Sequence, residues 1–158
     1  MAFNDLILGG GGDEPDPTAL AAHGASMFVD IEFGPAEALK RLAADVVALI
    51  DTGASVNCID DDLARALRLP VIDLAPMGGV GGLHQSNVYL ASLHVKSLNA
   101  RFYEPLHGVH LAAAGLEHRI LLGRPFLRHF VLVYDGMRGV VSIADHASRA
   151  AVLSTRLA

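Results

Sequence analysis

A short apolar run that ends in an aspartate and a tight loop constrains this chain more than any other feature. Residues 48–55 are Ala48, Leu49, Ile50, Asp51, Thr52, Gly53, Ala54 and Ser55. Successive aliphatic residues indicate a buried strand, and the Asp and Gly that follow are residues that turns favour. The fold must therefore bring one carboxylate to the end of a strand and hold it in a loop. The pattern occurs once in the chain.

The length and composition favour one globular domain. The chain has 158 residues, and at this length roughly 68–70% of the unfolded surface can be buried without help from a disulfide or metal. Hydrophobic residues make up 52% of the sequence, which favours an apolar interior or a sizeable interface. We expect a flexible segment over 1–24, with a stretch rich in Gly and Pro at 9–17. The domain should cover 25–146, and 147–158 should form a tail or short helix.

Charge and cysteine usage argue against several classes of function. The net charge is −5 and Lys and Arg form no cluster, so we expect no nucleic-acid partner, which would need phosphate neutralisation. Cys58 is the only cysteine, which excludes an internal disulfide and suits a reducing compartment. The first residues lack the apolar stretch of a secretory signal, and no apolar run reaches the ~20 residues that span a bilayer. We therefore expect a soluble, cytoplasmic protein with no membrane partner.

Local patterns in the first half of the chain predict strands separated by short helices. Period-two alternation predicts a strand over 27–33. After a proline, a helical stretch is expected over 36–44, and a strand returns over 46–50. A helix follows over about 60–69. The three consecutive aspartates at its start, 60–62, are interpreted as a helix cap and a solvated face rather than a metal site.

The second half of the chain predicts further strands and a hairpin. A strand over 88–95 follows a glycine-rich stretch, and aromatic residues predict another near 102–103. The apolar run 119–123 is typical of a buried strand, and it leads into a short helix from Arg124. An Asp-Gly turn predicts a hairpin over 130–143. We therefore expect a mainly β fold, a small closed barrel or sandwich with short helices.

Asp51 is the residue on which any chemistry of the loop would depend. Leu49 and Ile50 make its approach apolar, so loss of hydration acts on the carboxylate. Gly53 has no Cβ and lets a second backbone or a substrate come close. Hydroxyl groups next to the carboxylate can hold the loop by hydrogen bonding. The residues that could support Asp51 are Thr52, Gly53, Ala54 and Ser55.

A single carboxylate of this kind suggests a particular route of acid–base chemistry. Two such groups about 3 Å apart share one proton. The ionised group can then activate water while the protonated group donates to a carbonyl oxygen. This route needs no metal and no cofactor. The alternative is that Asp-Thr-Gly forms an ordinary turn.

Two further elements follow in the order that this chemistry needs. A stretch typical of the tip of a mobile hairpin, able to close over a peptide, consists of Gly78, Gly79, Val80, Gly81 and Gly82. An ordinary flexible loop is the alternative for this stretch. Later in the chain, Leu122, Gly123 and Arg124 join a buried strand to a helix, and the glycine permits close passage of a neighbouring loop.

With these motifs, the chain resembles the retropepsin-like aspartic peptidases of retroviruses, retrotransposons and their cellular and bacterial relatives. The resemblance covers about 25–145 and implies a closed β-barrel with one catalytic loop per chain. It implies that Asp51 is the catalytic carboxylate and that a homodimer supplies the second one to hydrolyse an extended polypeptide. It also implies that Thr52 bonds across the dimer axis, and that Gly53 and the flap backbone, 78–82, pair with the substrate.

The chain departs from the viral pattern in several places, among them an extra insert over 35–44 and 24 extra residues at the N-terminus. Viral enzymes have a further aspartate after the Asp-Thr-Gly-Ala run, whereas this chain has Ser55, Val56 and Asn57, which leaves Arg124 without that charge partner. The helix after the loop resembles the cellular and bacterial relatives more closely. The dimer-forming termini of the viral enzymes have no clear counterpart, so the sequence leaves the mode of dimerisation open.

The histidines and the single cysteine offer alternatives. His107, His110 and His118 form the best histidine cluster, but their spacing matches no helical zinc motif, so we expect surface or core histidines. Cys58 would need a positioned base to act as a nucleophile, and a small buried residue is the simpler interpretation. Three functions remain open: an aspartic endopeptidase, a non-catalytic peptide-binding or dimerisation module, and a peptidase dedicated to itself or to one partner.

Overall fold

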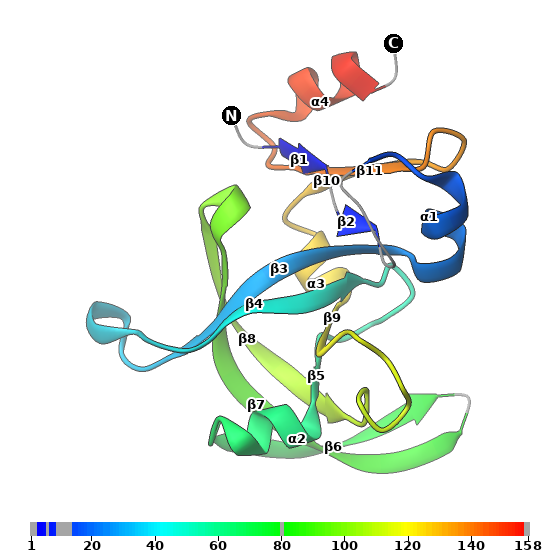
Figure 1. Cartoon of the computed structure of the whole chain (residues 1–158). Coiled ribbons are helices and arrows are strands. Elements are labelled where there is room, and N and C mark those ends of the chain that lie inside the picture. Colours follow the sequence, from blue (N-terminus) through cyan, green and yellow to red (C-terminus); the bar gives the residue numbers. More distant parts are fainter. Residues whose placement is uncertain (1–2, 6, 9–13, 80, 157–158) are drawn as a thin grey trace.

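The structure is a computed structural model that describes residues 3–5, 7–8, 14–79 and 81–156. These residues form mainly β-strands with short helices between them (Figure 1). The strands are β1 (Phe3–Asp5), β2 (Ile7–Leu8), β3 (Ala25–Phe33), β4 (Lys40–Ile50), β5 (Cys58–Asp60), β6 (Val71–Gly79), β7 (Gly82–Val95), β8 (Ala100–Val109), β9 (Ile120–Leu122), β10 (Val131–Asp135) and β11 (Val140–Ala144). The helices are α1 (Pro17–His23), α2 (Asp61–Ala66), α3 (Arg124–Leu127) and α4 (Arg149–Arg156), with 3-10 turns η1 (Ala36–Ala38) and η2 (Lys96–Leu98). None of the helices in the described ranges is long and apolar enough to cross a membrane.

Six strands close into a barrel. In spatial order these are β3, β4, β9, β5, β8 and β7, and β3 pairs with β7 to complete the ring. The β4–β9 and β5–β8 pairs are parallel, and the other pairs of the ring are antiparallel. Closure leaves no free sheet edge around the ring. The expectation of a mainly β fold with a small closed barrel is therefore confirmed.

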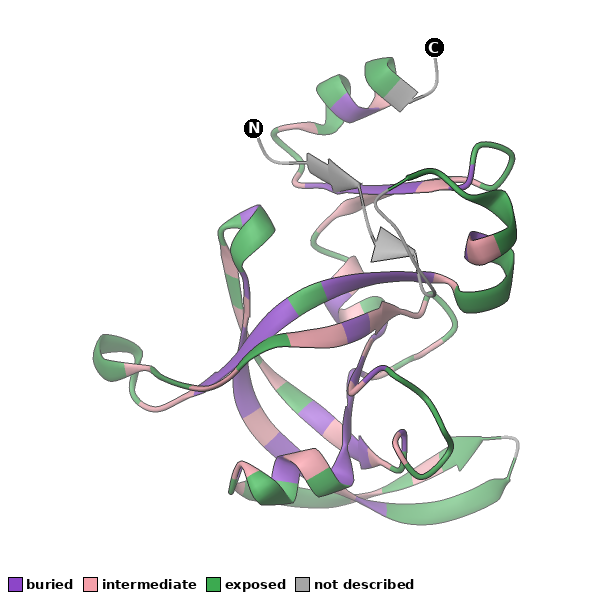
Figure 2. Ribbon diagram, viewed as in Figure 1, coloured by how far each residue is buried: buried purple, intermediate pink, exposed green. Residues whose placement is uncertain are grey.

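Apolar residues of the barrel strands fill its interior. Val29 and Ile31 of β3 and Ile120 and Leu122 of β9 have no exposed surface, and Phe126 of α3 packs into the same core. Full burial of an aliphatic side chain of this size stabilises the fold by about 1.5–3 kcal/mol. Figure 2 shows buried positions on β3 and β5, whereas β6 and the first residues of β7 are mainly exposed. The outer part of the β6–β7 hairpin therefore projects from the packed part of the molecule.

A smaller antiparallel sheet of β1, β11 and β10, in that order, lies at one end of the molecule (Figure 1). Val141 and Ile143 of β11 belong to the main core. Val133 and Ala144 of the same sheet pack instead against Val152 of α4. The sheet is thus covered on both faces, by the barrel core and by α4. In the view of Figure 1 the β6–β7 hairpin lies at the opposite end.

The prediction of a helix over 36–44 is wrong. Only η1 is helical there, and the chain is already in β4 from Lys40 onward. The two strands form a hairpin in which Phe33 lies opposite Lys40 and Phe28 lies opposite Val47. Pairing along this length outweighs the local helical pattern, because side-chain packing against a neighbouring strand decides β-structure more than propensity does.

The expectation of a cap and a solvated face holds for only part of the three aspartates at 60–62. Asp62 is exposed, and Asp60 occupies the N-cap position of α2 but makes no side-chain cap hydrogen bond. Asp60 and Asp61 are buried, with 3% and 4% of their surface exposed. Asp60 Oδ1 accepts a hydrogen bond from the Ala112 amide at 3.1 Å, and Asp61 Oδ1 accepts one from the Tyr89 hydroxyl at 2.6 Å. Partners far along the chain bring these carboxylates inside, which local spacing does not reveal.

The N-terminal segment expected to be flexible contains β1, β2 and α1 in its described part. Asp16 caps α1 by accepting hydrogen bonds from the amides of Thr18 (2.9 Å) and Ala19 (3.0 Å), and Leu20 is buried in the core. Residues 9–13 of the Gly- and Pro-rich stretch lie outside the described residues. The segment expected to be a tail or short helix contains α4. The domain boundaries stay predictions.

Candidate active site

Asp51 lies directly after β4, where this strand runs beside β9. Ile50 and Leu122 are register partners in the parallel pair, and the Asp51 amide donates to the Leu122 carbonyl oxygen at 3.0 Å. Leu122 itself is fully buried, and Asp51 is half-buried. The barrel therefore fixes the backbone on both sides of the point where the carboxylate leaves the sheet.

A tight loop holds one oxygen of this carboxylate. Asp51 Oδ1 accepts hydrogen bonds from the amides of Gly53 (3.0 Å) and Ala54 (3.2 Å). The Ala54 amide also lies 3.2 Å from the Asp51 carbonyl oxygen. Within the described residues the other carboxylate oxygen, Oδ2, has no hydrogen-bond partner. The carboxylate thus has a fixed orientation and one oxygen free to meet another molecule.

The loop around Asp51 leaves little room for a side chain at its glycine, and its two hydroxyl side chains point outward to solvent-exposed positions. A Cβ on Gly53 would lie 3.2 Å from Asp51 Oδ1 and would crowd the oxygen that the loop holds. Thr52 and Ser55 are exposed, and neither hydroxyl has a hydrogen-bond partner in the part of the chain that the structure describes. These hydroxyls do not lock the loop within one chain, and they are available to a second molecule.

Gly123 and Arg124 attach the loop to β9 and α3. Arg124 Nη1 donates to the carbonyl oxygens of Gly53 (2.8 Å) and Thr52 (3.1 Å). A Cβ on Gly123 would lie 2.9 Å from the Ala54 carbonyl oxygen, so the loop can pass this close only over a glycine. Backbone carbonyls of the loop therefore take the place of the carboxylate that the sequence lacks beside Arg124.

Asn57 supports the same junction, and the sequence did not single it out. Its Oδ1 accepts a hydrogen bond from the Gly123 amide at 2.9 Å, and its backbone carbonyl oxygen accepts one from the His107 amide at 2.9 Å. Only 2% of its surface is exposed. A polar residue between a loop and a buried strand was the available signal, but its partners lie 50 and more residues away along the chain.

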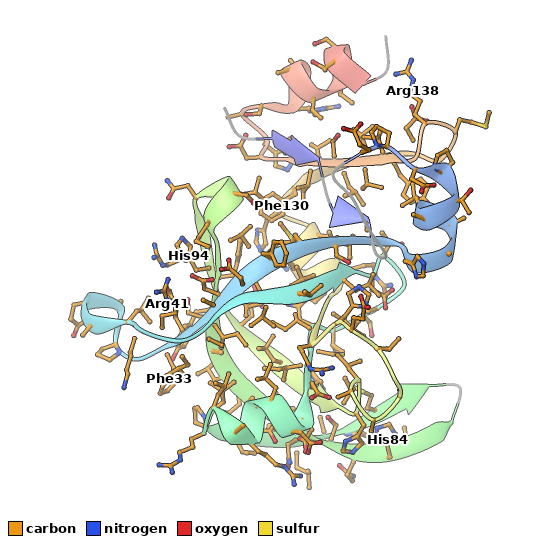
Figure 3. The ribbon with its side chains drawn as sticks, in the orientation of Figure 1. Phe33, Arg41, His84, His94, Phe130 and Arg138 are labelled. Atoms are coloured by element: carbon orange, nitrogen blue, oxygen red, sulfur yellow. The ribbon has the colours of Figure 1, made fainter. Side chains whose placement is uncertain are left out.

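The glycine-rich stretch lies at the tip of the β6–β7 hairpin. Gly79 and Gly82 are register partners next to the turn, and Val80 lies outside the described residues. His84, labelled in Figure 3, lies on the β7 arm of this hairpin. The hairpin and the active-site loop together line a cavity of about 270 Å³, whose walls include Gly53, Val56, Cys58, Met77, Gly78 and His107. The structure therefore brings the two sequence motifs to one place, and their roles in catalysis stay predictions.

Cys58 lies in the wall of this cavity beside the loop. Burial, and to a lesser extent the charge of Asp51, raise the pKa of the thiol to about 11. The thiolate is the reactive form of cysteine. At neutral pH this side chain is therefore a protonated, apolar wall element and not a nucleophile.

The three histidines that form a cluster in the sequence have different surroundings in the structure. His118 Nε2 lies 2.8 Å from Ser26 Oγ, His107 belongs to the cavity wall, and His110 is exposed. Burial lowers the pKa of both His107 and His118. Across the described ranges, no three His, Cys, Asp or Glu side chains are placed to hold a metal ion.

A closed barrel that presents one aspartate in an Asp-Thr-Gly loop, with a glycine-tipped hairpin on the other side of a cavity, defines the class of retropepsin-like acid proteases. Residues 43–126, more than half of the chain, match the family model described as aspartyl protease, and the chain belongs to this family. Among solved structures, the solution structure of the simian foamy virus (mac) protease is similar. It is 16% identical, with 65% of this chain and 91% of that chain covered and a TM-score of 0.43. No curated protein matches the chain.

Proposed function

We propose that the chain is an aspartic endopeptidase that hydrolyses peptide bonds of extended polypeptides as a homodimer. The observation that carries the proposal is the state of Asp51, whose Oδ1 is held by two amides while Oδ2 has no partner within the described chain. Acid–base chemistry of this kind needs a second carboxylate that shares the proton. A two-fold axis beside the loop supplies it from an identical chain.

In this mechanism the two Asp51 side chains share one proton and titrate as a pair. The ionised carboxylate accepts a proton from water as the water oxygen bonds to the carbonyl carbon of the substrate. The protonated carboxyl gives its proton to the carbonyl oxygen. When the tetrahedral intermediate breaks down, the C–N bond is cleaved and the proton taken from water passes to the departing nitrogen. One hydroxyl of the intermediate gives its proton back to the other carboxylate as the C=O bond re-forms, which restores the shared proton. The cycle uses neither a metal nor a cofactor.

The cavity between loop and hairpin supports an extended polypeptide as the substrate. Its walls carry the backbones of Gly53 on one side and Gly78 on the other, and exposed backbone groups of this kind can pair with a peptide as an added strand. The hairpin, largely exposed and glycine-rich at its tip, serves as a lid that closes over the bound peptide. The lone reduced Cys58 suits a cytoplasmic enzyme.

Cleavage of a diverse peptide library between mildly acid and neutral pH tests the proposal, with Asp51→Asn as the matched variant. The wild type should cut with an optimum on the acid side of neutral, because the pair must retain one proton. Asp51→Asn should lose measurable cleavage without a change in thermal unfolding. Specific activity should rise with protein concentration as dimers form.

Three outcomes would contradict parts of the proposal. Equal cleavage by wild type and Asp51→Asn would show that Asp51 is not the catalyst. Activity in a demonstrated monomer would exclude the two-chain mechanism. A folded wild type that binds peptides and cuts none would be the non-catalytic peptide-binding module on the same fold.

A further inference from the structure

We propose that the cavity between the active-site loop and the β6–β7 hairpin selects one substrate residue with an uncharged hydrogen-bonding side chain, best a carboxamide, and that His107 recognises it. The inference rests on the proposed function, because it names the substrate class of the same site. His107 is then a specificity-determining residue that contacts the substrate away from the bond that is cut.

The position and size of the cavity fit one side chain of a bound peptide. Its walls come from the catalytic loop (Gly53, Val56), from the hairpin (Met77) and from the barrel strands behind them (Cys58, His107). A peptide that passes between loop and hairpin must place a side chain here. The volume of about 270 Å³ lies below the range of about 300–1,000 Å³ that is usual for whole small-molecule ligands.

The half-buried imidazole of His107 is a polar group of this wall that lacks a side-chain partner within the described residues, as does the exposed Ser55 hydroxyl. Its Nδ1 is shielded from solvent and has no hydrogen bond within the described residues. The backbone around it is fixed, because His107 lies in register with Cys58 of β5 and Val88 of β7, and its amide donates to the Asn57 carbonyl oxygen at 2.9 Å. Since Nδ1 is shielded, the ring meets the cavity through Nε2, which has no hydrogen bond within the described residues. A substrate group that covers Nε2 without pairing with it would leave this nitrogen desolvated and unpaired. The ring is thus held in place with an unused hydrogen-bonding group.

The cavity carries no formal charge at neutral pH. Its wall contains no Asp, Glu, Lys or Arg among the described residues. Burial lowers the pKa of His107, although the charge of Asp73 acts in the opposite direction, and the Cys58 thiol stays protonated. A charged substrate side chain would lose hydration here without an opposite charge in the wall. The wall therefore offers no ion-pair partner to a charged substrate side chain, and the nearby charges of Asp51 and Asp73 further disfavour Asp and Glu.

A carboxamide matches the imidazole better than an aliphatic side chain of the same shape. Neutral imidazole has one donor and one acceptor nitrogen, whereas a carboxamide offers both a donor and an acceptor and so suits either tautomer. Leu has nearly the shape of Asn, and Met nearly that of Gln, but neither can pair with the ring. Sites that pair with a substrate group reject the analogue that lacks it, because the site's own polar atom is then left unpaired.

Peptide binding by the full-length Asp51→Asn chain tests the inference without depending on catalysis. An array of extended peptides, each position scanned through all side chains, is probed with this protein and with double variants that add His107→Leu, His107→Gln or His110→Leu. At one peptide position, Asn and Gln should be retained at least about tenfold better than Leu and Met. His107→Leu should abolish this preference, whereas His107→Gln, which keeps a hydrogen-bonding group, should preserve it.

The control and the contradicting outcomes are distinct from those of the proposed function. His110 is exposed and is no part of the cavity wall, so His110→Leu should leave the profile unchanged. If His107→Leu does not fold, His107→Phe takes its place. No preference for Asn and Gln at any position, a preference that survives loss of the imidazole, or no peptide retained would overturn the inference. Retained peptides that the wild type fails to cleave would instead overturn the proposed function and leave the selectivity intact.

Discussion

Arg124 Nη1 lies 2.8 Å from the carbonyl oxygen of Gly53, so the first helical turn after β9 holds the loop that presents Asp51. The same nitrogen reaches the Thr52 carbonyl oxygen at 3.1 Å. One planar guanidinium therefore fixes two successive peptide units of the loop. The orientation of the Asp51 carboxylate depends on these units, because the Gly53 amide donates to Asp51 Oδ1.

Arg124→Met should reduce activity more than stability. Because Arg124 is exposed, loss of its hydrogen bonds should lower the free energy of unfolding by only about 1 kcal/mol. The freed loop should lower kcat by about tenfold or more, since small misplacements of a catalytic group are costly. Arg128→Met, one helical turn further along and also exposed, is the matched control. Urea unfolding and peptide cleavage measure both effects, and equal kcat values for the two variants would contradict the role of Arg124.

Gly123→Ala should destabilise the chain through the active-site loop. The added Cβ would collide with the carbonyl oxygens of Val56 and Ala54, which are backbone atoms of the loop. Overpacking of this kind typically costs about 1–3 kcal/mol. Gly81→Ala is the control for stability, since a Cβ there meets nothing within 4 Å. Thermal unfolding should separate the two variants clearly, and similar melting temperatures would show that the loop can move aside without cost.

Tyr89→Phe should loosen the base of the β6–β7 hairpin. Tyr89 lies opposite Val71, at the start of the hairpin, and its hydroxyl donates to Asp61 Oδ1 at 2.6 Å in a buried setting. Loss of a hydrogen bond to a charged group should cost about 1.5–3 kcal/mol of unfolding free energy. We expect KM to rise more than kcat falls, because the hairpin then closes less readily. Tyr103→Phe, at a ring that is half exposed, should change neither quantity, and the prediction fails if both variants behave alike.

Features set by neighbouring residues could be predicted from the sequence. The strand that leads to Asp51, the short strand and helix around Gly123 and the Asp-Gly hairpin near the C-terminus are local patterns, and each is present in the structure. The glycine-rich tip could be placed on a hairpin for the same reason. The order of these parts was enough to indicate the closed barrel, because the resemblance covered most of the chain.

Features set by distant partners could not be predicted. The aspartate at position 61 meets a tyrosine hydroxyl 28 residues away, and Asn57 meets Gly123 66 residues away. Spacing along one sequence carries no information on such pairs. The β4 strand was missed over its first residues for a related reason, since pairing with β3 decides its conformation. The unpaired nitrogen of His107 likewise emerges only when three strands and the hairpin come together.

Asp30 should make stability depend on pH in the acid range. Its carboxylate is 1% exposed, and Arg41, labelled in Figure 3, is one of its ion-pair partners. Burial alone would raise the pKa of this carboxyl. A hydrogen bond from the Asp45 amide (2.9 Å) and the interactions with Lys96 and Arg41 lower it by more, so the net pKa lies below the ordinary value. A carboxyl whose pKa is lower in the folded chain stabilises the fold at pH values above its pKa in the unfolded chain, which is about 4. This stabilisation is lost as the pH falls through the pKa of the folded chain.

Asp30→Asn isolates this contribution. At pH 7 the variant should unfold about 1.5–3 kcal/mol more easily than the wild type, because hydrogen bonds to a charged group are lost. The difference should shrink steadily below pH 4, where the wild-type carboxyl becomes protonated. Glu37→Gln, at an exposed position, should follow the wild type throughout. Urea titrations at several pH values measure the differences, and a gap that stays constant down to pH 2 would show that the charge of Asp30 does not stabilise the fold.

Cys58 reports on the charge of Asp51 through its reactivity. Its thiol is 5% exposed, and burial followed by the Asp51 charge raise its pKa to about 11. At pH 8 the thiolate fraction should be lower than that of a free thiol by about a hundredfold, so iodoacetamide should label the folded chain slowly and the urea-unfolded chain fast. Because the pKa of the thiol is higher in the folded than in the unfolded chain, the thiol also stabilises the fold below about pH 8.5, and this stabilisation declines as the pH rises and the thiol of the unfolded chain ionises.

Asp51→Asn removes the charge that helps to raise the pKa of Cys58 and should speed labelling several-fold, whereas Asp62→Asn should not. Equal labelling of the folded variant and wild type would mean that the two side chains do not interact across the cavity wall.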